Sequence, residues 1–318
     1  MGLLIPEVFI IQITDAAFFI LLLSVSPAAV SILRGWDFTS ASQRQYRLEK
    51  KRHLVSAAVR LIFIFKIPLF LFYIYANDKL SNVLTGAMCA AGSINATVFG
   101  APLLYVKIAL LFLMTFWMTV NRVSSKSEEL PHTRALYGFL LVITALSGAE
   151  TLLSFANFTS MDTSAVVSCC SSIYSGADSS PLMSLSPFTA FGIFAAVSAL
   201  LIVSVLLKKT GWTALFSILF FFSGVLNLIL FTGTYVYELP SHKCPYCILQ
   251  REYLYTGYLF YISLFTGSAA GVNSFIYNKL SGREDAGYLR LCFWAAIIYS
   301  ALSIFYPIRY YLINNVWL

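Results

Sequence analysis

A pair of closely spaced cysteines is the feature of this chain with the most evident chemistry. Cys244 and Cys247 stand in the segment His-Lys-Cys-Pro-Tyr-Cys-Ile-Leu-Gln-Arg, which ends at Arg251. Proline is favoured at the first position of a helix, where its missing N–H costs nothing. Pro245 therefore predicts a helix that begins there, with Cys244 as its capping residue. The helix dipole and the adjacent Lys243 both favour a thiolate there. Cys244 is therefore predicted to be the reactive sulfur.

A helix that starts at this pair would carry further chemistry on one face. Helical spacing places Cys247, Arg251, Tyr255 and Tyr258 on that face. Arg251 would supply charge and donors to a reduced quinone oxygen, with Gln250 beside it, and the two rings would form a wall. The alternatives are a structural bridge or metal clip above an interfacial aromatic belt. A two-residue loop closes little chain entropy, which favours redox or metal chemistry over a passive bridge.

The remaining cysteines extend the possible thiol chemistry. Cys169 and Cys170 are neighbours in the sequence, and a bridge between neighbours is strained and easily reduced, as a relay requires. The alternatives are a soft-metal site, or a bridge from one of them to Cys89 with its neighbour left as a thiol. Cys292 is expected to be a packed apolar residue. His242 is placed to tune a thiol or to join it as a metal ligand.

The composition indicates how these residues are positioned. Hydrophobic residues make up 59% of the 318 residues and charged residues 11%, against roughly 25% charged in soluble domains. This predicts an all-α, polytopic membrane bundle in a lipid bilayer, built as a single transmembrane domain over 1–318 with halves 1–157 and 158–318. Apolar runs long enough to cross a bilayer fall at 8–33, 54–76, 101–121, 135–157, 187–207, 213–236, 252–276 and 289–313.

The charge pattern predicts an orientation. Basic residues concentrate in alternate connections, so these connections are expected to be cytoplasmic and both termini extracytoplasmic. The outer loops 77–100, 158–186 and 237–251 then hold five of the six cysteines, which favours a bacterial inner membrane with those loops in an oxidising periplasm. Basic residues confined to connections exclude a nucleic-acid stripe. No basic residue precedes the first run, so no cleaved signal peptide is expected.

Two local patterns resemble known families. The Cys-x-x-Cys pair followed by Gln250 and Arg251 resembles the DsbB and BdbC family of disulfide-forming membrane proteins. Cys89 with Ile94-Asn-Ala-Thr and Gly100-Ala-Pro is similar to the loop and following span of vitamin K epoxide reductase relatives. The resemblance implies that Cys244 and Cys247 are the quinone-proximal pair, Arg251 a quinone contact and Cys89 a shuttle thiol. Both families are four-helix bundles. The order of the loop cysteine first and the Cys-x-x-Cys pair last follows the vitamin K epoxide reductase relatives. The arginine after the pair follows the DsbB and BdbC family.

Five charged residues fall inside the predicted spans, where charge is costly enough to suggest function. Arg60 is expected to reach toward the interface. The others are expected to form lysine–carboxylate pairs that lock the bundle, with Asp15 and Glu150 as acceptors for Lys66 and Lys107. The alternative is a proton path that serves a quinone or a transported substrate.

Three functions fit the sequence. The first is a membrane thiol–disulfide oxidoreductase that passes electrons from an extracytoplasmic thioredoxin-like or other thiol-bearing partner, through Cys89, Cys169, Cys170, Cys244 and Cys247, to ubiquinone or menaquinone. The second is a carrier or sensor of soft metal ions of the Cu or Hg type, which uses the same thiols. The third is a transporter whose outer loops are stapled by disulfides. No residue is assigned as a ligand of a resident metal.

Overall fold

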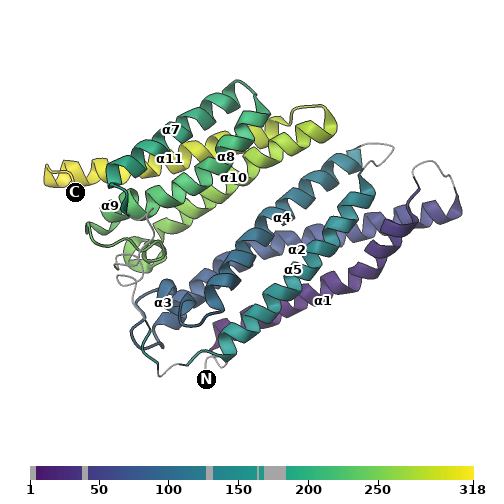
Figure 1. Cartoon of the computed structure of the whole chain (residues 1–318), viewed down its shortest axis with the longest axis horizontal. Helices are drawn as coiled ribbons and strands as arrows, with labels where there is room; N and C mark the ends of the chain where they lie inside the picture. The colour runs from purple at the N-terminus through teal and green to yellow at the C-terminus, as the bar shows by residue number, and fades with distance from the viewer. Residues whose placement is uncertain (1–4, 38–41, 127–131, 163–164, 168–183) are drawn as a thin grey trace. The chain divides into compact units, whose positions relative to one another are not determined.

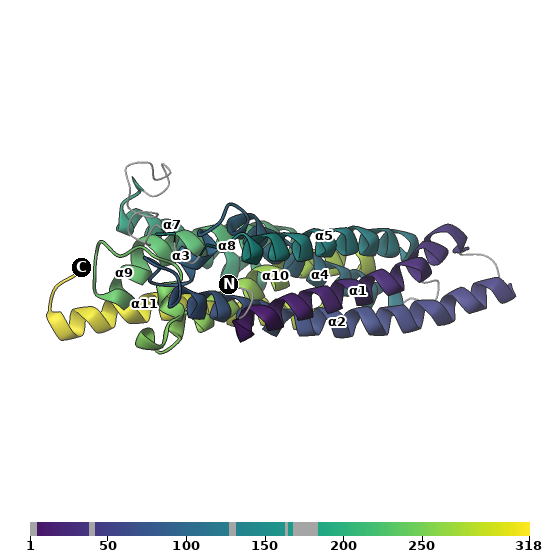
Figure 2. The same cartoon turned by 90° about the horizontal axis from the view of Figure 1, so that it is seen from below.

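The structure is a computed structural model that describes residues 5–37, 42–126, 132–162, 165–167 and 184–318. Within these ranges the regular elements are all helical, as Figures 1 and 2 show. Eight of the described helices are long and apolar enough to cross a membrane. The predicted multi-span helical architecture is therefore confirmed, and its apolar helices fit the predicted bilayer environment. The predicted orientation of the termini, and the single domain with its halves, stay predictions.

Unit 1, the first of two compact units, comprises residues 1–80 and 94–165. Its long helices are α1 (Pro6–Gly35), α2 (Gln43–Ser81), α4 (Gly100–Lys126) and α5 (Thr133–Thr159). The short α3 (Ala90–Ile94) ends where the chain re-enters this unit. Helix α5 packs against both α1 and α4 (Figure 1). Pro27 lies inside α1, and the helix continues to Gly35.

Two lysines and two carboxylates from four different helices form a closed ring of ion pairs in the core of unit 1. Lys66 of α2 lies 3.1 Å from Asp15 of α1 and 2.5 Å from Glu150 of α5. Lys107 of α4 lies 2.8 Å from each carboxylate. All four side chains are at most 5% exposed. Each charge therefore has two opposite neighbours, and the predicted lysine–carboxylate pairs are confirmed.

Aromatic faces complete the surroundings of this ion ring. Lys107 Nζ lies 4.9 Å from the ring centroid of Tyr73, and Lys66 Nζ lies 5.8 Å from that of Phe18. Such contacts add attraction for a desolvated ammonium group. Arg60, the fifth charge, takes no part: its side chain is exposed and its Nε donates to the Ser56 carbonyl.

Unit 2 comprises residues 81–93 and 166–318. Its long helices are α7 (Pro187–Leu206), α8 (Thr210–Asn227), α10 (Thr256–Ser281) and α11 (Ala286–Asn314). A π-helical turn, η3 (Leu228–Thr232), joins α8 to α9 (Gly233–Tyr237). The core is aromatic: Tyr299 of α11 packs edge-on against Phe194, Phe220 and Phe260, and its hydroxyl donates to the Gly224 carbonyl at 2.6 Å.

We expect Lys107→Met to lower the free energy of unfolding by about 3–5 kcal/mol, because it leaves both buried carboxylates to share one cation, Lys66. Adding Glu150→Gln removes the surplus negative charge and should recover more than half of that loss. Chemical or thermal unfolding in detergent or nanodiscs measures both effects. Arg60→Met, which removes an exposed cation of the same unit, is the matched control. A loss at Lys107→Met no larger than at Arg60→Met would contradict this role of the ring.

Candidate functional site, a buried three-cysteine cluster

Three cysteines meet inside unit 2. The sulfurs of Cys89 and Cys244, 155 residues apart in the chain, are 3.5 Å from each other. With Cys247 they form a group whose Sγ atoms all lie within 4.8 Å of one another. The three residues are 0%, 2% and 5% exposed. A separation of 3.5 Å is a contact between sulfurs and well beyond the roughly 2.05 Å of a disulfide bond, so a small movement would suffice for bond formation.

A tyrosine hydroxyl holds the Cys-Pro-Tyr-Cys loop. Tyr237, the last residue of α9, donates from Oη to the Cys244 carbonyl at 2.5 Å and accepts from the Ile248 N–H at 2.9 Å. An α-helix through this segment would need a direct bond between that N–H and that carbonyl, since they are four residues apart. The Tyr237 hydroxyl therefore occupies the place of the first helical hydrogen bond. Tyr261 of α10 fixes the same loop by donating to the Pro245 carbonyl at 2.7 Å.

This arrangement corrects the predicted helix. The chain passes through two 3-10 turns, η4 (Cys247–Leu249) and η5 (Arg251–Tyr253), before α10 begins at Thr256. Leu254 and Tyr255 between them have left-handed backbone, at φ 53° and 56°. The prediction that Cys244 caps an α-helix is wrong, as is the prediction of one helical face, and the helix dipole does not act on Cys244. The Tyr246 N–H instead points at the Cys244 sulfur from 3.4 Å.

The loop that carries Cys89 is tied to the same place. The Cys89 carbonyl accepts from the Gly92 N–H at 3.0 Å as α3 begins. Gln250 Nε2 donates across to the Met88 carbonyl at 3.0 Å and so joins the two cysteine loops. Gly86 turns the chain with a φ of +88°, where a side chain would be strained, and a Cβ there would lie 2.7 Å from the Val167 carbonyl oxygen. These contacts explain why Cys89 is held against the pair.

The four predicted quinone contacts differ in exposure and in the neighbours that they meet. Gln250 is half-buried and engaged with the Cys89 loop, whereas Arg251 is exposed. The ring of Tyr255 is 45% exposed and lies 6.3 Å, between centroids, from that of the half-buried Tyr258. The exposed Leu254 stands between Arg251 and Tyr255 in the chain.

His242 adjoins the cluster. Its ring packs edge-on against Tyr237 with centroids 4.4 Å apart, and its Nε2 is buried without a hydrogen-bond partner. Burial lowers the pKa of His242, against a smaller opposite effect from Cys89. With a pKa below its usual value near 6.5, the imidazole is predominantly neutral at pH 7. A neutral imidazole can accept a proton from a neighbouring thiol.

Two other predicted site residues, Cys169 and Cys170, lie outside the described residues. Cys292 is buried in α11, where its sulfur is 3.8 Å from the Ser217 hydroxyl. Sequence reasoning did not identify Tyr237 and Tyr261 as anchors of the loop. A tyrosine seven residues before the pair gives no local signal of this role, because the contact depends on how α9 is turned.

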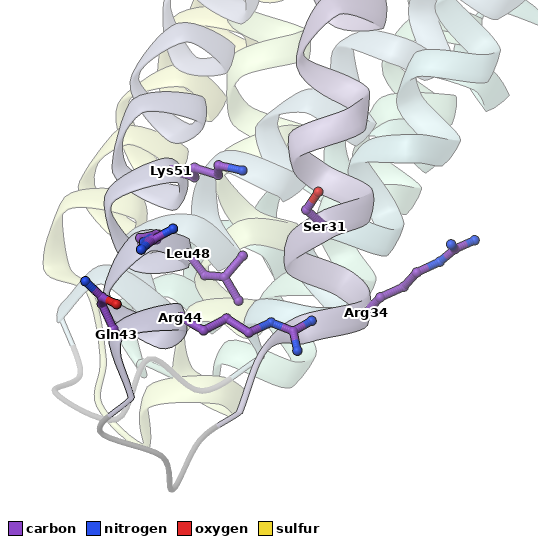
Figure 3. Close-up of a pocket in the computed structure, with 7 residues that line it drawn as sticks. Ser31, Arg34, Gln43, Arg44, Leu48 and Lys51 are labelled. Atoms are coloured by element: carbon purple, nitrogen blue, oxygen red, sulfur yellow. The ribbon is translucent and has the colours of Figure 1, made fainter.

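A concave surface lies in unit 1, between the end of α1 and the start of α2. It has a volume of about 530 Å³ and is lined by Ser31, Arg34, Gln43, Arg44, Arg47, Leu48 and Lys51. Figure 3 shows Arg44 and Leu48 reaching from α2 toward α1, with Arg34 directed away. Four cationic side chains, from the end of α1 and the start of α2, agree with the concentration of basic residues in alternate connections.

Comparison with protein-family models, with curated proteins and with solved structures found no match for this chain. The functional argument therefore depends on the geometry of the cysteine cluster.

We expect Tyr237→Phe to leave the buried Cys244 carbonyl and Ile248 N–H unsatisfied, which costs about 1–3 kcal/mol per group locally. Amide hydrogen exchange across residues 244–250 should accelerate while exchange in α10 and α11 stays unchanged. Tyr235→Phe is the control, because its hydroxyl makes only a 3.5 Å contact with the Leu318 carbonyl. Equal exchange in the two variants would show that Tyr237 does not hold the loop.

Proposed function

We propose that this chain is a membrane thiol–disulfide oxidoreductase in which Cys89 exchanges with a Cys244–Cys247 disulfide. The supporting observation is the 3.5 Å approach of the Cys89 and Cys244 sulfurs, with Cys247 in the same group. Thiol–disulfide exchange requires a thiolate to reach one sulfur of a disulfide, and these positions satisfy that requirement. Cys292, apart from this group, takes no role.

The exchange balances as follows. The Cys89 thiolate attacks Cys244 Sγ, the Cys244–Cys247 bond breaks, and Cys247 leaves as a thiolate. A second thiol, from a partner protein or from Cys169 or Cys170, then attacks Cys89 and releases the Cys244 thiolate. Cys89 and the second thiol, now joined by a disulfide, have together lost two electrons and two protons. Cys244 and Cys247 have gained the two electrons and are thiolates.

Reoxidation of the pair needs a two-electron acceptor, and a membrane quinone such as ubiquinone or menaquinone supplies one. Arg251 is the proposed donor to its oxygen, with Gln250, Tyr255 and Tyr258 as neighbouring contacts. His242, held neutral by its lowered pKa, is suited to take up the proton of a reacting thiol. The proposal places the cysteine loops in the bacterial periplasm, with both termini on that side of the inner membrane and a thioredoxin-like or other thiol-bearing protein as the partner.

We expect Cys244→Ser to abolish thiol-dependent quinone reduction by the purified protein, because it removes the sulfur attacked by Cys89. Cys292→Ser, which removes a cysteine outside the cluster, should retain the activity. In Cys247→Ser, mild oxidation should trap a Cys89–Cys244 disulfide that peptide mass mapping detects. Undiminished quinone reduction by Cys244→Ser would reject the proposal.

A second candidate function is soft-metal binding by the reduced cluster. Thiolates bound to one ion at about 2.3 Å stand roughly 4 Å apart, and the three sulfurs, within 4.8 Å of one another, are compatible with that spacing. Buried thiolates without oxygen ligands favour Cu(I) or Hg(II) over harder ions. This arrangement would serve a carrier or a sensor of such ions.

If the protein has this function, we expect its reduced form to bind one Cu(I) per chain and to show a sulfur-to-copper charge-transfer band in the ultraviolet. This band should be lost in Cys89→Ser and kept in Cys292→Ser. Titration against a competing chelator gives the stoichiometry. Binding that survives Cys89→Ser would exclude the three-cysteine site, and binding without any quinone chemistry would favour metal handling over electron transfer.

A further inference from the structure

The concave surface between the end of α1 and the start of α2, termed the basic cleft, gathers positive charge on one face of a helix. Arg44, Arg47 and Lys51 of α2 are three and four residues apart, so they share a face, and they line the cleft together with Leu48. Arg34 of α1 also lines it, although its guanidinium is directed away (Figure 3). The volume of about 530 Å³ is in the range of pockets that hold small ligands.

The end of α1 lets side chains of α2 reach across the cleft. Gly35 is the last residue of α1, and a Cβ there would lie 3.1 Å from Arg44 Nη2 and 3.3 Å from Leu48 Cδ1. Because Gly35 has no side chain, Arg44 and Leu48 pack directly against α1. Figure 3 shows both of them extending from α2 toward that helix. The cleft therefore has a cation fixed at its mouth and an apolar residue at its base.

The chain supplies little negative charge to this region. Residues 31–54 include six lysines and arginines and two acidic residues, Asp37 and Glu49. Glu49 is half-buried and accepts a hydrogen bond from Gln45 Nε2 at 3.3 Å, and Asp37 is exposed beyond the end of α1. Within the described ranges, neither carboxylate forms an ion pair with a cation of the cleft. The cleft therefore favours an anion that comes from outside the chain.

Apolar surface continues from the cleft along both helices. On α2, Leu54 and Leu61 follow Lys51 by three and ten residues on the same side of the helix, and they are 66% and 59% exposed. On α1, Ile20 precedes the cleft-lining Ser31 by eleven residues on the same face and is 62% exposed. Both helices are long and apolar enough to cross a membrane. A free anion gains nothing from this surface, whereas the acyl chains of a lipid would cover it.

The charge and the apolar surface meet at the depth expected of lipid headgroups. The apolar run of α1 ends at residue 33, directly before Arg34, and that of α2 begins at residue 54, just after Lys51. Basic pockets between membrane helices bind phosphate headgroups in this zone. Basic residues that only set the orientation of a membrane protein need neither a cleft nor a shared helical face. Their convergence on one concave surface is therefore the observation that carries the inference.

We propose that the basic cleft binds the phosphate-bearing headgroup of an anionic glycerolipid, whose acyl chains lie against the exposed apolar faces of α1 and α2. Arg44, Arg47 and Lys51 are the donors to the phosphate oxygens. Arg44, packed against Gly35, holds the headgroup at the end of α1, so the lipid links the two helices. This site belongs to unit 1 and is independent of the cysteine chemistry.

Native mass spectrometry of the purified, delipidated full chain tests the site, with dioleoyl phosphatidylglycerol as the probe. One lipid should bind per chain more tightly than further copies, and dioleoyl phosphatidylcholine, whose headgroup has no net charge, should not replace it. The triple variant Arg44→Gln, Arg47→Gln, Lys51→Gln should weaken this first binding step by at least about tenfold, because each basic residue near an anionic lipid contributes roughly fivefold. An unchanged first step in the triple variant would overturn the proposal.

A matched triple variant separates the cleft from total charge. Lys209, Arg283 and Arg290 are exposed cations of unit 2, and their joint replacement by Gln should leave the first binding step unchanged. An equal loss in the two triple variants would show that only net charge matters and would reject the site. Inorganic phosphate at millimolar concentration should not displace the bound lipid. Displacement would assign the cleft to free anions and reject the lipid.

A variant that keeps every charge tests the shape of the cleft without altering the charges that orient the chain. Ser31→Trp places a large side chain in the cleft and should weaken the first binding step severalfold. Ser24→Trp is the matched control, because Ser24 is an exposed serine of the same helix that does not line the cleft. Both hydroxyls donate to carbonyls of their own helix, so each substitution loses a similar bond. Equal binding by the two variants would contradict a lipid held in the cleft.

Discussion

A lipid interior offers no hydrogen bonds, and every charge or backbone polar group placed there must be satisfied by the protein itself. The ion ring of unit 1 is the most demanding case. Four helices each contribute one charge, and the charges cancel, so removal of any one leaves an uncompensated ion among buried side chains. Because no two members come from the same helix, the pairing also requires α1, α2, α4 and α5 to assemble together.

The same constraint shapes the cysteine site. The Tyr237 hydroxyl bonds to the two backbone groups that would otherwise begin a helix, and the loop it creates carries Cys244 toward Cys89. The resulting cluster is buried, so the proposed exchange with a protein partner would require Cys89 to become accessible.

Much of the architecture follows from composition and charge alone. Apolar runs predicted the eight spans, and opposite charges inside those runs predicted that Lys66 and Lys107 pair with Asp15 and Glu150. The local structure around Cys244 was not predictable, because Pro245 favours a helix start and the residue that prevents the helix lies in another element. The contact of Cys89 with Cys244 depends on tertiary folding that spacing does not encode, and Cys169 and Cys170 lie outside the described residues.

The π-helical turn η3 sets the direction in which Tyr237 points. Its defining bond runs from the Gly233 N–H to the Leu228 carbonyl, and a Cβ on Gly233 would lie 2.5 Å from that oxygen. Such a turn amounts to one extra residue in a continuous helix. Removing it would rotate everything beyond by about 100°, the angle per residue of an α-helix, and would carry the phenol away from the loop. The register of the helix that leads into Tyr237 therefore decides whether Cys89 and Cys244 can meet.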